Sequence, residues 1–147
     1  MKDRFVRFAA AVMTVFFVSA VPVDTAAADL RVTITGVRSD GGTVRMNLYD
    51  HSDAFPKSKT AVMGGKAPAK KGTVEIRFTG LKPGRYAAAL YHDENDNGKF
   101  DQGIFGIPLE GYAFSNNAKA FLSAPSFEDA AFDLPAADGA IEIRMGY

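Results

Sequence analysis

The most chemically distinctive stretch of the sequence is DENDNGKFD at residues 93–101, where six of nine side chains carry a carboxylate or amide oxygen. A calcium ion takes six to eight oxygen ligands, and a short loop supplies them when alternate residues point inward and a glycine permits a sharp turn. Gly98 occupies the sixth position of the D-x-[DN]-x-[DN]-G pattern. This register predicts a calcium site with the ligands Asp93, Asn95, Asn97, the Lys99 carbonyl and Asp101.

The predicted site departs from an EF-hand at the twelfth position, where Ile104 replaces the bidentate glutamate. The residues before the loop alternate as a strand, and Gly103 and Pro108 follow it. A further ligand is therefore needed, and the alternatives are Glu110, Asp96, a carbonyl or water. With few carboxylates in the motif, the expected dissociation constant is on the order of 10⁻⁴ to 10⁻³ M.

A plain, solvated hairpin tip is the alternative interpretation of residues 93–101, because Asn, Asp and Gly are also the residues that turns prefer. Calcium is favoured because oxygen-bearing residues at positions 1, 3, 5 and 9, with glycine at position 6, form a more specific pattern than turn composition. Magnesium fits less well, since it demands tighter octahedral geometry.

Candidate catalytic residues are few. His51 and His92 are the only histidines, and His92 adjoins Asp93, so a hydrolase that uses His92 near a bound metal is one alternative. Ser115 lies in no G-x-S-x-G elbow and has no evident partner. Ser115 and its neighbours are better explained as residues that tie down a loop through side-chain to backbone hydrogen bonds.

Four carboxylates could be drawn into pairs for glycoside hydrolysis, but they cluster on one loop system, where ion coordination explains them more simply. These are Asp93, Glu94, Asp101 and Glu110. The sequence therefore predicts a protein without a catalytic site.

The elements that must position these residues are strands, because apolar residues alternate with period two along the chain. Residues 30–35 and 44–49 flank the turn-rich stretch 39–42 and predict a β-hairpin. Residues 73–78 and 85–92 follow, and the alanines of the latter indicate close packing on both faces. About seven short strands favour an all-β, antiparallel two-sheet sandwich, Ig-like or prealbumin-like.

Two long segments fit no strand, residues 50–71 and 102–128, and loops of this length are usually functional or flexible. The first is rich in lysine, at positions Lys57, Lys59, Lys66, Lys70 and Lys71. Its lysines favour a solvated loop that protects a strand edge, with attraction to anionic lipid or cell-wall phosphate as the alternative.

The second long segment contains five aromatic residues, Phe105, Tyr112, Phe114, Phe121 and Phe127. Anchoring of the loop on the sandwich is favoured over a ligand platform, because the aromatics are irregularly spaced among turn residues. Should the loop bind a ligand, the candidate contacts are Tyr112, Phe114, Asn116 and Asn117.

The first 28 residues predict a secretory signal peptide, with basic residues, then an apolar run, then small residues before a cut after Ala28. The remaining single domain, 29–147, has no cysteine and no second apolar stretch, so neither disulfides nor stable membrane insertion is expected. The full sequence has 17 basic and 17 acidic residues, and losing three basic and two acidic residues with the leader leaves a net charge of −1. That balance argues against a nucleic-acid partner.

Three ordered motifs, GLKPGRYAAALYHDENDNGKFD, FGIPLEGYAFSNNA and PSFEDAAFDL, resemble the bacterial exported family named domain of unknown function 2141. The resemblance spans nearly the whole of residues 30–147 and implies a small periplasmic or secreted β-sandwich without an assigned reaction. The GLKPGRY segment is also similar to the G-L-x-P-G-x-Y turn of transthyretin-like and collagen-adhesin B-type modules, which implies a structural role for Tyr86.

Taken together, the sequence predicts an exported, calcium-stabilised β-sandwich that is a non-enzymatic binding or structural module. The main alternative is a periplasmic carrier that holds a small apolar ligand between the aromatic loop and the sandwich. The expected partner is a protein or a small molecule that the sequence does not identify.

Overall fold

The computed structural model describes residues 27–147. Eight strands account for most of its regular structure: β1 (Ala28–Val37), β2 (Thr43–Tyr49), β3 (Met63–Pro68), β4 (Gly72–Leu81), β5 (Gly84–Asp93), β6 (Tyr112–Phe114), β7 (Phe132–Leu134) and β8 (Gly139–Arg144). Four short helical turns are interspersed: η1 (Ser58–Thr60), η2 (Ile104–Gly106), η3 (Ser115–Asn117) and α1 (Phe127–Ala130).

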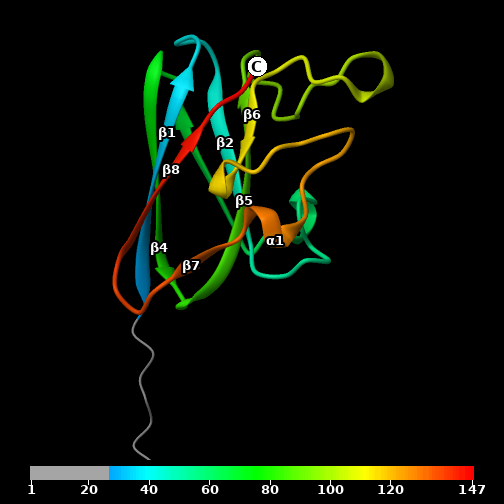
Figure 1. The fold of residues 1–147 in the computed structure, drawn as a ribbon. Helices are drawn as coiled ribbons and strands as arrows, with labels where there is room; N and C mark the ends of the chain where they lie inside the picture. The colour runs from blue at the N-terminus through cyan, green and yellow to red at the C-terminus, as the bar shows by residue number, and fades with distance from the viewer. Residues whose placement is uncertain (1–26) are drawn as a thin grey trace, which may run out of the picture.

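The strands form two sheets that face each other, as the sequence predicted for an all-β sandwich (Figure 1). One sheet has the order β4-β1-β8, and the other has the order β3-β2-β5-β6, with β7 pairing the start of β5. All pairs are antiparallel except β1 with β8, which run parallel. This parallel pair was not expected from the sequence.

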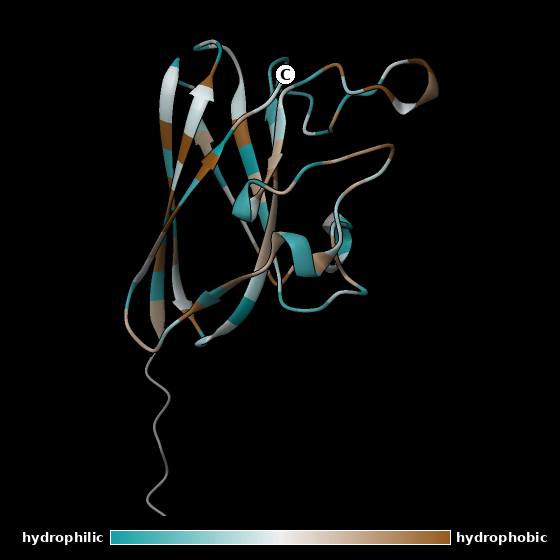
Figure 2. Cartoon of the chain, viewed as in Figure 1, coloured by the Kyte–Doolittle hydropathy of each residue, from teal (hydrophilic) through white to brown (hydrophobic). Residues whose placement is uncertain are grey.

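The interior of the sandwich follows from period-two alternation, since successive side chains of a strand point to opposite faces. On β1, Leu30, Val32 and Ile34 are buried, and on β2 the same holds for Val44, Met46 and Leu48. Figure 2 shows the resulting alternation of hydrophobic and hydrophilic bands along the strands. The predicted inward residues of these strands are confirmed.

The predicted hairpin between residues 30–35 and 44–49 is wrong, because β1 and β2 belong to different sheets. Their connection crosses from one sheet to the other, and at its end Gly42 has a φ of 78°. A Cβ at Gly42 would lie 2.0 Å from the Asp93 carbonyl oxygen, so glycine is required for the approach of β2 to β5. The alternation of apolar residues identified the buried face of each strand, but it did not identify the strand that lies beside it.

The expectation that residues 50–71 form one long loop is also wrong, because β3 lies within it and forms an edge of the larger sheet. At the inward position Gly65, a Cβ would come within 2.8 Å of the Ile76 and Phe78 side chains. The close packing of the two sheets therefore excludes an apolar side chain there. That exclusion removes the alternation by which the strand would have been recognised. Residues 102–128 likewise contain the short strand β6 and the first turn of α1.

A second hydrophobic cluster lies on the outer face of the larger sheet, away from the sandwich interior. Its buried members are Tyr49, Phe55, Ala87, Phe114, Phe127 and Ala130. Segments from both long connections supply this cluster, so β5 is packed on its two faces, as its alanines predicted.

The predicted signal segment, 1–28, lies outside the described residues except for its last two. Ala28 is buried at the start of β1 and pairs with Leu81. Within residues 27–147, no helix has both the length and the apolar character needed to cross a membrane.

Candidate functional site

The register of the larger sheet places two rows of outward-facing side chains next to each other. One row runs Lys66, Arg45, Tyr91, Tyr112, and the neighbouring row runs Gly64, Asn47, Ala89, Phe114. The second row has small residues at its first three positions. This pairing leaves a shallow depression on the outer face of the sheet, bounded by the larger side chains. We call the residues at its base the floor.

Aromatic rings form a continuous series along one side of this floor. Tyr91 contacts Phe100 at a centroid separation of 5.6 Å, Phe100 contacts Tyr112 at 5.8 Å, and Tyr112 contacts Phe114 at 6.0 Å. Phe114 then contacts Phe55 of the outer cluster at 5.8 Å. Most of these contacts are edge-to-face, the geometry that ring quadrupoles favour. We call this series the aromatic ladder.

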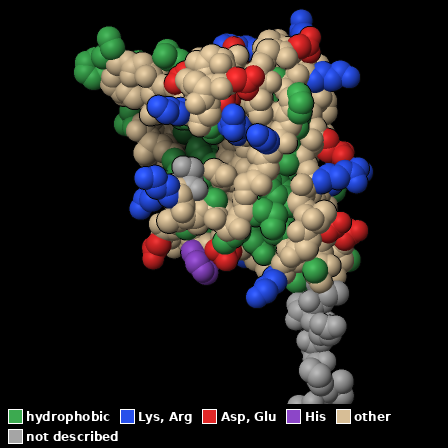
Figure 3. Space-filling view, turned by 180° about the vertical axis from the view of Figure 1, so that it is seen from behind, with side chains coloured by type: hydrophobic (Ala, Val, Ile, Leu, Met, Phe, Trp, Pro, Cys, Tyr) green, Lys and Arg blue, Asp and Glu red, His purple; other side chains and the backbone are tan. Residues whose placement is uncertain are grey.

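The floor, the aromatic ladder and two loops enclose a cleft of about 1130 Å³. Its loop walls come from residues 98–108 above β5 and residues 120–124 beside the outer cluster. The size is comparable to ligand-binding pockets, which span roughly 300–1000 Å³. In Figure 3 the same face is visibly hollowed, with hydrophobic side chains inside the hollow.

The loops beside the cleft expose large apolar side chains to solvent. Phe105 and Leu122 are 98% and 99% exposed, and both line the cleft. Ile107 is also exposed and lines it. Exposed apolar side chains gathered in one place typically mark a binding surface.

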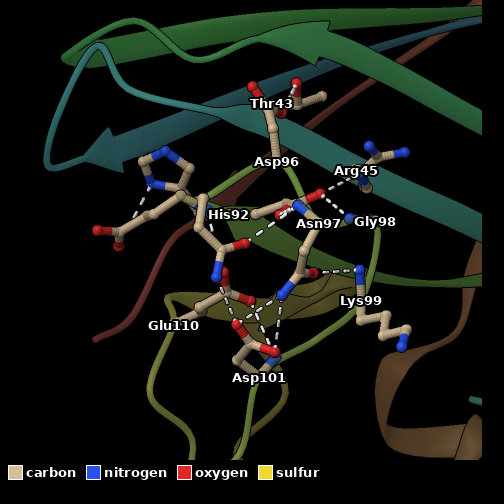
Figure 4. Close-up of polar contacts among 12 residues, drawn as sticks. Thr43, Arg45, His92, Asp96, Asn97, Gly98, Lys99, Asp101 and Glu110 are labelled. Atoms are coloured by element: carbon tan, nitrogen blue, oxygen red, sulfur yellow. Dashed lines mark hydrogen bonds and ion pairs between the residues drawn. The ribbon is translucent and has the colours of Figure 1, made fainter.

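Above the cleft, the 93–101 loop is held by its own side chains, as Figure 4 shows. The Asp93 carboxylate accepts hydrogen bonds from the backbone N–H groups of Asn97 and Gly98, at 3.0 and 2.8 Å. The Asn97 side-chain oxygen accepts one from the Lys99 N–H at 2.8 Å. These bonds fold the chain around the positive-φ residue Gly98 in a tight turn.

Among the predicted metal ligands, Asp93, Asn95, Asn97 and Asp101 lie in one hydrogen-bonded group. The side-chain amides of Asn95 and Asn97 donate to the Asp101 carboxylate at 2.7 and 2.9 Å. In this arrangement amide nitrogens, not oxygens, face Asp101, so both amide groups would have to turn to ligate a cation with it. No cluster of three His, Cys, Asp or Glu side chains with metal-binding geometry occurs in residues 27–147.

Glu110 and Asp96, the candidates for a further metal ligand, make hydrogen bonds that hold the loop in place. Glu110 is buried, and its two carboxylate oxygens accept from the N–H groups of Glu94 and Asp101, each at 3.0 Å. Asp96 accepts from the Thr43 hydroxyl at 2.6 Å. Glu110 therefore fastens both ends of the loop, while Asp96 ties its tip to β2.

Arg45 connects the loop to the floor of the cleft. Its Nε donates to the buried Asp93 carboxylate at 2.6 Å. Burial raises the pKa of Asp93, but the hydrogen bond from Arg45 and those from the Gly98 and Asn97 N–H groups outweigh it, so its net pKa is lowered. The same hydrogen bond raises the pKa of Arg45. Both groups are thus charged near neutral pH.

The other sequence-predicted residues divide between the cleft and the body of the fold. Tyr112 and Phe114 line the cleft. Asn116 donates to the Asp129 carbonyl, and Asn117 accepts from the Arg144 N–H, so both fasten η3 outside the cleft walls. Ser115 is buried and bonded to backbone groups of Ala88 and Ala130, in line with the loop-fastening role expected for it.

His92, the candidate general base, lies on the opposite face of β5 from the cleft floor and is fully buried. Its Nε2 donates to the Gly41 carbonyl at 2.7 Å, because a carbonyl can only accept. Its Nδ1 lies 2.8 Å from the Tyr147 hydroxyl. Both ring nitrogens are thus engaged within the fold.

The cleft floor was missed at the sequence level. Arg45, Asn47 and Ala89 lie on predicted strands with the outward parity, but Gly64 and Lys66 belong to the strand that was not recognised. The sequence shows which positions of the recognised strands point outward. It does not show which strands pair, and it is this pairing that makes these residues neighbours.

One family model matches residues 32–142. The chain belongs to this family, "Uncharacterized protein conserved in bacteria (DUF2141)". No curated protein and no solved structure matches it. The DUF2141 match confirms the resemblance noted in the sequence, and the matched segment includes the floor of the cleft and both of its loops.

Proposed function

We propose that this DUF2141 protein is a non-enzymatic binding protein that holds a small molecule with an apolar body in the cleft on the outer face of the larger sheet. The observation that carries the proposal is a floor of small residues, Gly64, Asn47 and Ala89, beside a wall of aromatic rings. The exposed Phe105 and Leu122 at the same cleft would be covered by such an occupant. Burial of apolar surface supplies the driving force.

Binding is favoured over catalysis by the residues around the cleft. Its lining includes no histidine, aspartate or glutamate among the described residues, and these are the side chains that most often act as general acids and bases. His92 is sealed within the fold by Gly41 and Tyr147. A hydrolase that uses His92 therefore has no supporting contact with this site.

Two further expectations belong to the proposal. Export to the periplasm or outside the cell is supported by the basic, apolar and small-residue order of residues 1–28. Calcium binding by residues 93–101 is supported by the ligand register and by the turn bonds that Asp93 and Asn97 accept. The likeness of the 80–86 turn to transthyretin-like modules fits the buried Tyr86, whose hydroxyl donates to the Lys82 carbonyl at 2.8 Å.

A neutral fluorescent probe, N-phenyl-1-naphthylamine, tests the cleft directly. We expect its emission to rise on binding to the wild-type protein, with about tenfold weaker binding by Gly64→Leu, whose side chain would fill the floor. A Cβ at Gly64 meets the end of the Asn47 side chain at 3.1 Å, and the backbone φ there is not left-handed, so the variant should fold.

The matched control is Thr73→Leu, which adds a similar apolar group at an exposed position on the other sheet. It should bind the probe like the wild type. Equal binding by Gly64→Leu and the wild type, at equal melting temperatures, would overturn the proposal, as would no binding at all.

A further inference from the structure

We infer that the ligand of the cleft is an amphipathic anion, an apolar or aromatic body that carries a carboxylate, phosphate or sulfonate group held by Lys66, Arg45 and Lys99. This inference rests on the proposed binding function and adds the charge of the ligand. It follows from the way in which cations are placed on the outer face of the larger sheet.

Two cations lie directly opposite each other on adjacent strands of that face. Arg45 of β2 pairs with Lys66 of β3. Side chains at such positions have Cβ atoms about 4.5–5.5 Å apart, and like charges there destabilise the sheet. An anion between them would turn this repulsion into attraction. Asp93 already compensates Arg45 from one side, and an anion bound between the two side chains would compensate Lys66 as well.

A third cation reaches the cleft from the loop above the floor. Lys99 follows the Gly98 turn, lines the cleft together with Arg45 and Lys66, and is exposed. Figure 3 shows Lys and Arg side chains gathered at the edge of the hollow that contains hydrophobic side chains. Neither lysine makes an ion pair with the described part of the chain.

The nearest compensating charge is already engaged. Asp93 is fully buried behind Arg45 and accepts from its Nε, which leaves the two terminal nitrogens of the guanidinium available as donors. Asp93 thus fixes the orientation of Arg45 while offsetting one of three positive charges. The described cleft lining contains no carboxylate, so its own side chains carry three positive charges, and Asp96, the next carboxylate that acts on Arg45, lies outside the lining in the loop above.

The two halves of the proposed ligand correspond to the two rows of the sheet. The anionic group would lie at the Lys66 and Arg45 end, where a guanidinium fork suits planar oxyanions. The apolar body would lie over Asn47 and Ala89 against the aromatic ladder. A carboxylate and a phosphate share this recognition chemistry.

A matched pair of probes isolates the contribution of charge. The anion 8-anilinonaphthalene-1-sulfonate has the same aromatic body as neutral N-phenyl-1-naphthylamine and adds one sulfonate. We expect the anion to bind the wild-type protein about fivefold or more tightly than the neutral probe in 20 mM salt. This difference should shrink in 500 mM salt because exposed charges are screened.

Charge reversal then locates the anion site. In Lys66→Glu/Lys99→Glu we expect binding of the anionic probe to weaken about tenfold or more, with binding of the neutral probe changed less than twofold. The control, Lys71→Glu/Lys82→Glu, makes the same change in net charge at exposed positions outside the cleft. It should leave both probes within about twofold of wild type. All four lysine side chains are exposed, so folding should survive, and melting temperatures verify it.

The two proposals fail in different ways. Equal affinities for both probes, or equal losses in the two double variants, would overturn the anion inference while leaving the cleft as an apolar binding site. If Gly64→Leu leaves both affinities unchanged, the cleft is not the binding site and both proposals fall. Competition by decanoate but not by decanol would support a carboxylate ligand. Competition by decyl phosphate would support a phosphate ligand. Loss of this competition in Lys66→Glu/Lys99→Glu would place either anion at these lysines.

Discussion

The two faces of the larger sheet are built in opposite ways. The inner face packs Val44, Met46 and Leu48 against a second sheet. The outer face is covered only in parts, by the loop-derived cluster around Phe55 at one end and by the 93–101 loop at the other. The uncovered middle is the cleft. The difference indicates that the inner face secures the fold and that the outer face is available for function.

Truncating a large side chain on each face should give the largest effects. Leu48→Ala and Phe55→Ala should each lower the free energy of unfolding by about 3 kcal/mol, because both side chains are buried. Chemical denaturation measures this loss.

Only Phe55→Ala should also weaken binding of N-phenyl-1-naphthylamine, since Phe55 supports Phe114 at the end of the aromatic ladder. Leu48 belongs to the core between the two sheets and does not line the cleft. An equal loss of probe binding in both folded variants would mean that the two faces do not have separate roles.

A smaller effect is expected where the loop is fastened to the outer face. Asp93→Asn removes the charged partner of Arg45 and should cost about 2 kcal/mol at pH 7. Because the pKa of Asp93 is lower in the folded protein than its ordinary value of 3.8, its stabilisation is fully present above that value. It is lost as the pH falls through the folded pKa.

Denaturation from pH 2 to pH 7 measures this dependence. The wild type should gain stability relative to Asp93→Asn as the pH rises, and the exposed Asp53→Asn should follow the wild type. A constant difference between the wild type and Asp93→Asn across this range would show that the charge of Asp93 does not contribute.

The smallest expected effect is that of calcium on the same loop. With a dissociation constant on the order of 10⁻⁴ M, 1 mM calcium would stabilise the folded protein by about 1.4 kcal/mol, or roughly 5 °C in melting temperature. Asp101→Asn should abolish the shift, and Asp133→Asn, exposed on β7, should retain it.

Scanning calorimetry in calcium and in chelator gives the measurement. Identical melting curves for the wild type, with no heat of calcium binding by titration, would leave hydrogen bonds alone to account for the order of the loop. That outcome would sharpen the contrast between the faces, because the outer face would then be organised without any ion.

The sequence was sufficient for the class of fold and for the buried side of most strands. Alternation at Leu30, Val32 and Ile34 reports a physical requirement of each strand separately. The neighbour of a strand depends on how whole sheets pack, so the β1–β2 hairpin was predicted wrongly. At β3, the space left for Gly65 by Ile76 and Phe78 removed the very pattern that identifies a strand.

The candidate site also has a local part that the sequence could predict and a long-range part that it could not. Turn bonds within residues 93–101 are local, so their composition and spacing could be recognised in the sequence. The partnership of Arg45 with Asp93 joins residues 48 positions apart, and the cleft needs two loops folded over one sheet face. Such long-range arrangements have no short sequence pattern. Tyr112 and Phe114 were named as candidate contacts because aromatic residues in a polar loop must pack on something, and both line the cleft.

The aromatic ladder gives the molecule an intrinsic optical signal. The sequence has five tyrosines and no tryptophan, and three of those tyrosines, Tyr49, Tyr91 and Tyr112, line the cleft. Ultraviolet emission from the unlabelled chain therefore comes in good part from rings that an occupant would touch. Any guest that absorbs near 300 nm would quench this light by resonance transfer, so natural extracts could be screened without a dye.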